Sequence, residues 1–515
     1  MLEACCQKAK KRMISKTYGY ALIGLNGIPV TVEVDVNNGL PSFEIVGLAD
    51  TAVKESKERV RSAIKNSGRT FPTKKITANL APADVKKEGS ALDLALAVGI
   101  LKASAQLIGD TDGVIFLGEL SLDGSVRRIN GVLPIIISAL KSGYNKFVIP
   151  KTNLQEACLV SGANVYPVDN LTQVIDHFSG HQIINPAPVK DYQSQTTKTF
   201  YDSDLSLVKG QAVAKRALEV AVSGGHNLLF VGSPGTGKTM LAKCIPTIMP
   251  DMTFEEALET TKIHSVCGYV KGEEGIVFSR PFRSPHHTAT TVSMTGGGAT
   301  LRPGEISLAH NGVLFLDEMP EYNRATLEAL RQPLEDRIIT VSRANGTVTY
   351  PANVMLCGSM NPCPCGNYGS PDRECTCTPY QIARYNAKIS GPLLDRIDIQ
   401  VQVDSVKYED LSVEEKAETS SVVRERVNKA RQIQAERFKQ DGILTNSDMG
   451  EKHIAKYCKL SQDCEKILKN AYQTFHLSPR ARSRIIKVAR TIADMSNSQD
   501  IRPEHILEAV SYRRS

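Results

Sequence analysis

The stretch Gly232-Ser233-Pro234-Gly235-Thr236-Gly237-Lys238-Thr239 matches the phosphate-binding pattern G-x-x-x-x-G-K-T over its whole length. Residues 227–231 before it read as a short buried strand, and residues 240–244 after it begin a helical pattern. A glycine-rich loop between a strand and a helix can wrap its backbone amides around phosphate groups. The stretch therefore predicts an α/β module that binds a nucleoside triphosphate.

Two side chains of this loop have predicted roles of their own. We expect Lys238 to reach the outer phosphates of ATP and the hydroxyl of Thr239 to ligate Mg²⁺. A glycine-rich turn with an unrelated lysine is the alternative. The strand before the loop and the helix after it favour the phosphate-binding interpretation.

A second signal is the apolar run Gly312–Leu316, which ends in Asp317 and Glu318. The acids stand at the carboxyl end of a predicted central strand, where α/β sheets bind ligands. We expect Asp317 to hold Mg²⁺ through water and Glu318 to polarise the attacking water. A third strand, residues 353–358, leads to Asn361, whose amide is expected to position that water. Unless the acids stand there by chance, these residues predict ATP hydrolysis.

Two arginines extend the predicted site beyond one subunit. Arg396 follows an apolar pair in the segment 391–398, and Arg480 lies at the start of a helical pattern. A lone arginine is usually a surface ion-pair partner. Together with the phosphate loop, however, the two fit a ring ATPase in which arginines from a neighbouring subunit neutralise the transferring phosphoryl group.

Four of the twelve cysteines are clustered in two C-x-C pairs. Zinc favours four thiolates in a tetrahedron, and two short turns rich in proline, glycine and asparagine are suited to supply them. Reduced structural thiols on a loop are the alternative, because C-x-x-C is the commoner zinc spacing. The candidate zinc ligands are Cys363, Cys365, Cys375 and Cys377.

Length and composition indicate a globular protein of two or three domains. The chain has 515 residues, of which 41% are hydrophobic and 23% charged. The sequence shows no apolar run of membrane-spanning length and no secretory leader, so we expect a cytoplasmic protein without a membrane partner. A net charge of +7 is compatible with nucleic acid but does not establish it.

The first part of the chain predicts an α/β domain over residues 14–182. Residues 1–13 carry a short basic run and are expected to be an extension, either a misassigned start before Met13 or a basic tail. The polar, proline-containing residues 183–204 predict a linker. The expected strands are 27–36, 42–46, 75–80, 114–117 and 146–149, and the expected helices are 52–66, 91–103 and 133–142.

The nucleotide-binding module is expected over residues 205–405, and a helical region over residues 406–515. The helical region should begin with a charged helix from about Val413 to Lys439. Pro479 and Pro503 are expected near helix starts, since proline fits the first turn.

Two β-hairpins are predicted as insertions in the nucleotide-binding module. Thr288–Thr300 places three glycines at a turn, and Ile338–Pro351 places Asn345-Gly346 at a turn, a strong hairpin signal. If such hairpins line the channel of a ring, Arg343 is a candidate contact for nucleic-acid phosphates. Ordinary surface hairpins are the alternative.

Five segments together carry a resemblance to a known family. The chain resembles the magnesium-chelatase-like branch of AAA+ ATPases, and closely the bacterial ComM/YifB family, over essentially residues 14–515. The resemblance implies Walker A and B roles for Lys238, Thr239, Asp317 and Glu318. It also implies that Asn361 is sensor 1, Arg396 the trans-acting arginine finger and Arg480 sensor 2. The segments are GSPGTGKT (232–239), RPFRSPHHTAT (280–290), GEISLAHNGVLFLDE (304–318), SMNPCPCG (359–366) and ISGPLLDRID (389–398).

The same resemblance implies a homo-hexameric ring with a C-terminal helical lid. Residues 14–182 are similar to the Lon-protease-like, S5-like domain. The serine and lysine of that protease fall at Ala91 and Leu133 here, and Ser90 lies one position away. Because the protease needs a serine beside an unprotonated lysine, we expect a non-proteolytic domain that serves assembly or DNA guidance.

The implied function is an ATP-driven DNA motor. By its resemblance to the ComM/YifB family, the protein is expected to act on single-stranded or branched DNA as a helicase. The expected reaction is branch migration while incoming DNA is integrated during natural transformation, alongside recombination proteins. The alternative is a motor subunit of a magnesium or cobalt chelatase, but such subunits lack a Lon-like N-terminal domain.

Overall fold

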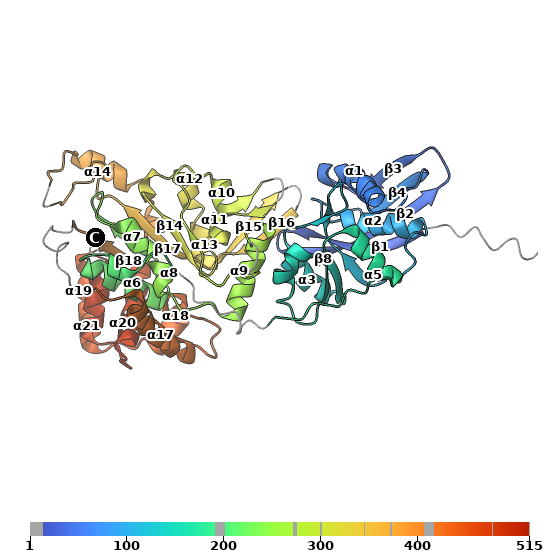
Figure 1. The fold of residues 1–515 in the computed structure, drawn as a ribbon. Helices are drawn as coiled ribbons and strands as arrows, with labels where there is room; N and C mark the ends of the chain where they lie inside the picture. The colour runs from blue at the N-terminus through green and yellow to red at the C-terminus, as the bar shows by residue number, and fades with distance from the viewer. Residues whose placement is uncertain are drawn as a thin grey trace, which may run out of the picture.

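The computed structural model describes residues 14–190, 201–270, 275–298, 301–343, 346–370, 373–405, 417–475 and 477–513. Figure 1 shows an N-terminal α/β domain beside a second α/β module that carries a helical lid. The predicted α/β fold with a C-terminal helical region is thereby confirmed. The predicted extension 1–13 lies outside the described residues.

The N-terminal domain is a seven-stranded mixed sheet in the order β3-β4-β2-β1-β5-β8-β9. Side chains alternate as the strand pattern predicts, so that Val30, Val32 and Val34 of β2 are fully buried. Every strand and helix predicted in this domain is present, with ends that shift by at most two residues. The strands are β1 (Ile14–Ile23), β2 (Asn26–Asn37), β3 (Ser42–Val46), β4 (Lys75–Ala81), β5 (Val114–Phe116), β8 (Lys146–Pro150) and β9 (Asn164–Val168), and the helices are α1 (Thr51–Asn66), α2 (Asp93–Ala103), α3 (Val132–Lys141), α4 (Leu154–Ala157) and α5 (Leu171–Ser179).

The second module is built on a five-stranded parallel sheet in the order β11-β14-β17-β10-β18. Strand β17 pairs with both β10 and β14, so the residues that follow it lie between the phosphate loop and the acidic strand end. The strands are β10 (Leu228–Val231), β11 (Phe282–Arg283), β14 (Val313–Leu316), β17 (Met355–Met360) and β18 (Ile399–Gln402), and helices α6 (Ala212–Gly224), α7 (Lys238–Lys243), α8 (Ile245–Ile248) and α9 (Phe254–Val266) belong to the same module.

The lid is helical and shares its hydrophobic core with the sheet module. Helix α6 packs against α17 and α20, and one buried apolar cluster runs from Leu205 to Tyr512. Pro479 and Pro503 begin helices as predicted, because proline is tolerated in the first turn. The lid helices are α17 (Ser420–Arg437), α18 (Glu451–Tyr457), α19 (Gln462–Thr474), α20 (Pro479–Met495) and α21 (Pro503–Ser511).

The predicted helix from Val413 to Lys439 is shorter in the structure. Helix α17 starts after Thr419, and residues 417–419 are not helical. The earlier part of that prediction falls on residues 406–416, which lie outside the described residues. Among the described helices, none is both long and apolar enough to cross a membrane.

One of the two predicted hairpins is confirmed and the other is partly wrong. Strands β15 (Ile338–Arg343) and β16 (Gly346–Pro351) pair antiparallel, as Asn345-Gly346 predicted. In the first, the expected arm before the glycines is instead the short helix α10 (Thr291–Thr295), capped by the side chain of Thr290. The ladder is therefore limited to β12 (Gly296–Gly297) and β13 (Arg302–Pro303).

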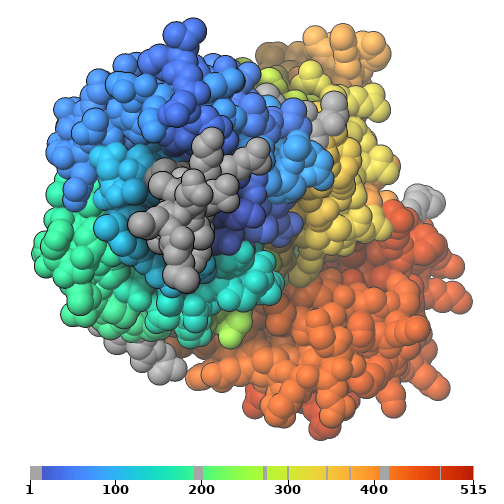
Figure 2. Space-filling view, turned by 90° about the vertical axis from the view of Figure 1, so that its right-hand side faces the viewer, coloured from blue at the N-terminus to red at the C-terminus, as the bar shows by residue number. Residues whose placement is uncertain are grey.

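The N-terminal domain packs on helix α9 of the second module. Ser265 joins the two, since its carbonyl accepts from the Gly131 amide at 3.0 Å and its hydroxyl donates to Glu156 at 2.6 Å. Glu156 is only 2% exposed, and burial raises its pKa. Figure 2 views the N-terminal domain, in blue to teal, in front of the module, with the orange-red lid to one side.

Candidate nucleotide site

The phosphate loop runs from the end of β10 to helix α7. Gly235 and Gly237 adopt left-handed backbone angles, with φ of 80° and 89°, which glycine adopts without strain. Gly232 is required for a different reason: a Cβ there would lie 2.2 Å from the carbonyl oxygen of Val403, at the end of β18. Gly235 and Gly237 are thus required by the backbone conformation, and Gly232 is required because a Cβ atom has no space there.

Lys238 is largely buried at the base of this loop, with 9% of its surface exposed. Its ammonium donates to the carbonyl oxygens of Gly232 at 2.6 Å and Ser233 at 2.8 Å, and to Oδ1 of Asn361 at 3.3 Å. Burial lowers the pKa of Lys238, against the opposing effect of Asp317 and Glu318. Strand β17 therefore brings Asn361 to the phosphate-loop lysine, 123 residues earlier in the chain.

Thr239 and Asp317 lie together although 78 residues separate them in the sequence. The Thr239 hydroxyl donates to Oδ2 of Asp317 at 3.0 Å, which places two oxygens where one Mg²⁺ can be ligated directly or through water. Glu318 is exposed beside them and has a left-handed φ of 49°. Both acids thus stand at the predicted sheet edge.

Ser359 is a site residue that the motifs did not single out. Its hydroxyl donates to Oδ1 of Asp317 and accepts from the backbone amide of Glu318 at 3.2 Å. The contact fixes the orientation of the Asp317 carboxylate. A small polar residue on β17, next to the acidic strand, is the sequence signal that could have indicated it.

The two predicted arginines lie in different settings. Arg480 is exposed on the first turn of α20. Arg396 is only 8% exposed, pairs with the Glu335 carboxylate and donates to the carbonyl oxygens of Arg331 at 3.0 Å and Pro392 at 2.9 Å. The guanidinium of Arg396 is thus held within its own subunit.

The hairpin arginine Arg343 is exposed at the end of β15. A Cβ at Gly297 would lie 3.5 Å from its Nη2, so the two hairpins are side by side at this point. Arg343 and Arg396 line one cleft of about 750 Å³ between β15 and the helix α13 (Arg331–Asp336). The cleft connects the hairpins to the segment of the predicted arginine finger.

The four clustered cysteines converge in space. Their sulfurs all lie within 4.8 Å of one another, and Cys363 is 3.3 Å from Cys365 and 3.7 Å from Cys375. Four thiolates at zinc bond lengths of 2.3 Å in a tetrahedron stand about 3.8 Å apart, so the donor set fits a zinc ion. The loop also packs on the nucleotide site, because a Cβ at Gly366 would lie 2.5 Å from the ring of Pro234.

The N-terminal domain lacks a serine-lysine pair at the expected position. Ala91 and Leu133 stand where the protease residues would fall, and the Ser90 hydroxyl donates to Glu119 instead. Nearby, the carboxylate of Asp93 is 1% exposed and pairs with Arg59 at 2.7 Å. Burial raises the pKa of Asp93 to about 6, against the lowering effect of Arg59.

Comparison with known families agrees with this architecture. Three models match successive parts of the chain: subunit ChlI of Mg-chelatase at residues 32–153, magnesium chelatase subunit ChlI at 204–411, and the ChlI C-terminal part at 417–513. The fold and the site thus define an AAA+ protein of the magnesium-chelatase type.

Full-length relatives identify the family within this class. The chain is 44% identical to protein YifB of Escherichia coli over 504 residues, 97% of each chain, and 44% identical to competence protein ComM of Haemophilus influenzae over 502 residues, 96% of each chain. It is also 23% identical to the DNA replication licensing factor mcm-6 of Caenorhabditis briggsae over 195 residues, 38% of this chain and 20% of the other. The chain belongs to the ComM/YifB family of magnesium-chelatase-like proteins, as its motifs predicted.

Proposed function

We propose that this protein is an ATP-hydrolysing motor that assembles as a homo-hexameric ring and moves DNA. The proposed substrate is single-stranded or branched DNA, and the proposed reaction is branch migration during integration of incoming DNA. Support comes from three sources: the geometry of the nucleotide site, the attachment of a hairpin to that site, and the relatives of the chain.

The nucleotide site supplies the groups that phosphoryl transfer to water requires. In this proposal the loop amides and Lys238 bind the phosphates of ATP, and Thr239 and Asp317 hold Mg²⁺. Glu318 is the exposed acid that polarises the attacking water, and Asn361 orients it. Mg²⁺ held by Thr239 and Asp317 would neutralise part of the negative charge that develops during the transfer.

The observation that carries the motor proposal is the direct connection between a hairpin and the nucleotide site. Strand β16 ends at Pro351, and β17, which leads to Asn361, begins at Met355. The base of the hairpin is closed by the Ala352 amide, which donates to the Arg337 carbonyl at 2.7 Å. A shift of β17 on hydrolysis would therefore move the hairpin and Arg343, the proposed phosphate contact.

The ring is proposed from the two arginines. During its transfer, the phosphoryl group needs more positive charge than the phosphate loop of one subunit supplies. We assign Arg396, as the trans-acting arginine finger, and Arg480, as sensor 2, to a nucleotide site that is shared between neighbouring subunits. Release from Glu335 is then the step that makes Arg396 available.

The pathway is proposed from the relatives. The name of competence protein ComM of Haemophilus influenzae refers to competence, and the name of the licensing factor mcm-6 refers to DNA replication. Both names favour DNA over a tetrapyrrole as the partner. We extend this to natural transformation and recombination, in a protein without a membrane partner that works in the cytoplasm.

The purified full-length chain tests the proposal. We expect ATP hydrolysis stimulated by single-stranded or branched DNA, and movement of a three-stranded junction. Arg343→Ala should raise the DNA concentration for half-maximal stimulation about tenfold, a loss typical of one strong phosphate contact. Arg502→Ala removes another exposed arginine, from the lid, and should leave that concentration unchanged.

A chelatase motor subunit is the competing function, because the matching models carry the chelatase name. A rate of ATP hydrolysis that is unchanged by DNA but raised by a chelatase partner would favour the chelatase function and contradict the DNA motor.

We propose that Cys363, Cys365, Cys375 and Cys377 bind one structural zinc ion. Metal analysis should find about one equivalent per chain in the wild type and none in the double variant Cys363→Ser/Cys375→Ser. Cys267→Ser changes a half-buried thiol outside the cluster and should retain the metal. Equal zinc content in the double variant and the wild type would reject the site.

A further inference from the structure

The turn between β1 and β2 is apolar, although two-residue turns usually carry polar side chains. Gly24 and Leu25 form the turn, and Ile23 precedes it. Gly24 is buried, and Leu25 is half-buried. Ile23 and Leu25 pack against the apolar cluster that contains the inward-facing side chains of the β15–β16 hairpin, which are Ile339, Val341, Val348 and Tyr350. The turn of the N-terminal domain thus adds to a core that belongs to the second module.

Gly24 lies directly against the hairpin. A Cβ at this glycine, whose φ is 62°, would lie 2.2 Å from Cγ1 of Val348 and 3.2 Å from the hydroxyl of Tyr350. Both of these hairpin side chains are buried. In Figure 1, β16 lies at the edge of the second module that faces the N-terminal domain. A side chain added at residue 24 would therefore displace the hairpin, the turn or both.

The contact lies closer to the free end of the hairpin than to its base. Val348 is paired with Val341, and two positions further along the ladder Arg343 is paired with Gly346. The base of the hairpin is joined to β17 through residues 352–354. The hairpin is therefore supported at its base by the nucleotide module and near Arg343 by the N-terminal domain.

The turn has a defined position because it adjoins the contact between the N-terminal domain and α9. Leu22, two residues before Gly24, packs on Gly131, since a Cβ at Gly131 would lie 2.0 Å from Cδ1 of Leu22. The amide of Gly131 is the group that donates to the carbonyl oxygen of Ser265 in α9. The attachment to α9 therefore holds the turn against the hairpin.

We infer that the N-terminal domain supports the β15–β16 hairpin, with Gly24 as the positioning residue that sets the place of Arg343. This inference rests on the proposed contact of Arg343 with DNA. Displacement of the turn tilts the hairpin about its base and moves Arg343 away from a bound strand. The affinity for DNA then changes, whereas the chemistry of ATP hydrolysis does not, because Gly24 lies outside the nucleotide site.

Gly24→Ala in the full-length chain tests this role. The concentration of single-stranded DNA for half-maximal stimulation of ATP hydrolysis should rise about fivefold, less than on loss of the whole phosphate contact. The rate of ATP hydrolysis without DNA should stay within about twofold of the wild-type rate. In an Arg343→Ala background, Gly24→Ala should raise that DNA concentration by less than a further twofold or about twofold, because its effect passes through Arg343.

Gly113→Ala is the matched control in the same domain. Its φ of 70° is similar to that of Gly24, so an alanine introduces similar backbone strain. No atom of the described residues lies within 4 Å of the added Cβ. Gly113→Ala should therefore leave the DNA concentration for half-maximal stimulation unchanged.

A compensating substitution separates the placement of the hairpin from a general loss of stability. Val348→Ala removes the two methyl groups that the new side chain would meet. The double variant Gly24→Ala/Val348→Ala should therefore require a DNA concentration within about twofold of the wild-type value. This variant also provides the test if Gly24→Ala alone does not fold.

A disulfide tests the contact in the absence of DNA. The Cβ added at Gly24 would lie 2.2 Å from Cγ1 of Val348, which is one bond from Cβ. The Cβ atoms of cysteines at these positions would be at most about 3.7 Å apart, a distance that a disulfide spans. Gly24→Cys/Val348→Cys should therefore form a crosslink on mild oxidation, identified by mass spectrometry, and Gly113→Cys/Val348→Cys should not.

Two outcomes would overturn the support of the hairpin. One is the absence of the disulfide between positions 24 and 348. The other is an equal DNA concentration for Gly24→Ala and Gly113→Ala although Arg343→Ala raises it. If Arg343→Ala leaves DNA stimulation unchanged while the disulfide forms, the proposed DNA contact fails and the support of the hairpin stands.

Discussion

The two ends of the five-stranded sheet differ in how far their titratable side chains are exposed to solvent. At the carboxyl end, Asp317 is half-buried and Glu318 is exposed, next to the phosphate-loop residue Thr239. At the amino end, His226 and Asp398 are buried and bonded to the lid. The carboxylates at the first end remain open to a ligand, and the Asp398 carboxylate at the second end is already paired with Arg484 within the chain.

The difference separates two tasks within one module. Exposed groups at the carboxyl end can change partners during a reaction with little loss of folding free energy. Buried ion pairs at the amino end have paid a desolvation cost, and breaking one leaves an uncompensated charge. Substitutions at the first end should therefore alter turnover, and those in the buried network should alter stability.

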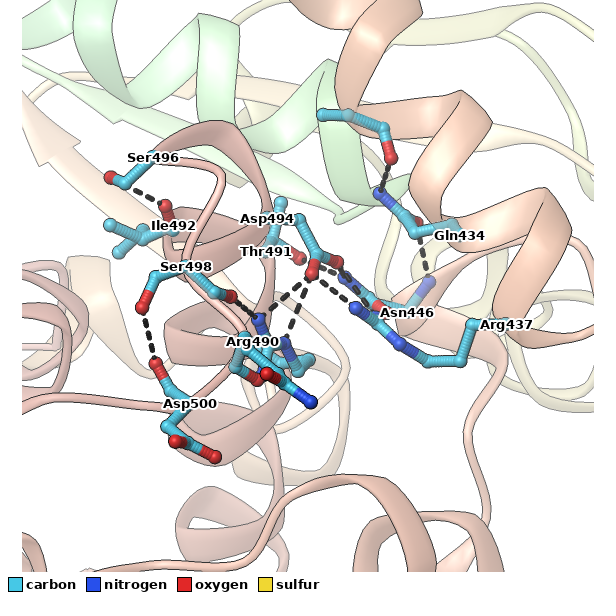
Figure 3. Close-up of polar contacts among 12 residues, drawn as sticks. Gln434, Arg437, Asn446, Arg490, Thr491, Ile492, Asp494, Ser496, Ser498 and Asp500 are labelled. Atoms are coloured by element: carbon cyan, nitrogen blue, oxygen red, sulfur yellow. Dashed lines mark hydrogen bonds and ion pairs between the residues drawn. The ribbon is translucent and has the colours of Figure 1, made fainter.

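The buried network extends from His226 into the lid, where Figure 3 shows Asp494 bound by Arg437 and Arg490. The largest effect is expected in this part of the network. Asp494→Ala leaves Arg437 and Arg490 without their shared carboxylate and should lower the free energy of unfolding by about 3–5 kcal/mol. Urea denaturation of the variant measures this loss. Glu504→Ala removes an exposed carboxylate from the same lid and should cost no more than about 0.5 kcal/mol. A similar loss of unfolding free energy in both variants would contradict a larger contribution of the buried network to stability.

The complementary variant at the carboxyl end is Glu318→Gln. It should lower ATP turnover about 100-fold, equivalent to about 2.7 kcal/mol, because the amide cannot polarise the attacking water. Its urea denaturation midpoint should match that of the wild type, since Glu318 is exposed. A large loss of stability would contradict the division between the two ends.

Gly366→Ala tests the contact between the cysteine loop and the phosphate loop. The variant combines a φ of 81° with a Cβ placed 2.5 Å from Pro234, and should cost about 1–2 kcal/mol of stability and weaken ATP-analogue binding. Gly369→Ala is the matched control, because its φ of 75° is similar and no atom lies within 4 Å. Both should destabilise, but only Gly366→Ala should change the nucleotide Kd.

The smallest effect concerns the pH dependence of stability. Burial lowers the pKa of His226, an effect that Lys487 and Arg431 reinforce and Asp398 opposes. In the unfolded chain the His226 imidazole therefore binds a proton near pH 6.5, whereas in the folded chain it stays neutral at that pH. The free energy of unfolding falls as the pH drops below 6.5. His226→Gln should flatten this slope by up to about 1 kcal/mol between pH 6.5 and 5.5 in urea titrations. An unchanged slope would show that His226 is protonated in the fold.

The carboxyl-end site was predictable because each of its parts follows a local pattern. A strand, a glycine loop and a helix indicate the phosphate site, and an apolar run ending in two acids indicates its partner. The link between Asp398 and Arg484 was not predictable, because 86 residues separate the pair and the motif that contains Asp398 does not indicate a partner in the helical region. The ion pair of Arg396 with Glu335 was missed because 61 residues separate the two in the sequence. The first hairpin was wrong in part because Thr290 caps a helix where threonine-rich sequence suggests a strand.

The position of α6 affects the order in which the chain folds during synthesis. Helix α6 buries its apolar face against α17 and α20, which follow much later in the chain. At about 5–20 residues per second, synthesis from the end of α6 to the start of α20 takes roughly 10–50 s. The N-terminal domain contains its own cores and can fold on the ribosome during this time. The ATPase module instead exposes apolar surface until the lid emerges, so nascent chains stalled before residue 479 should need chaperones most.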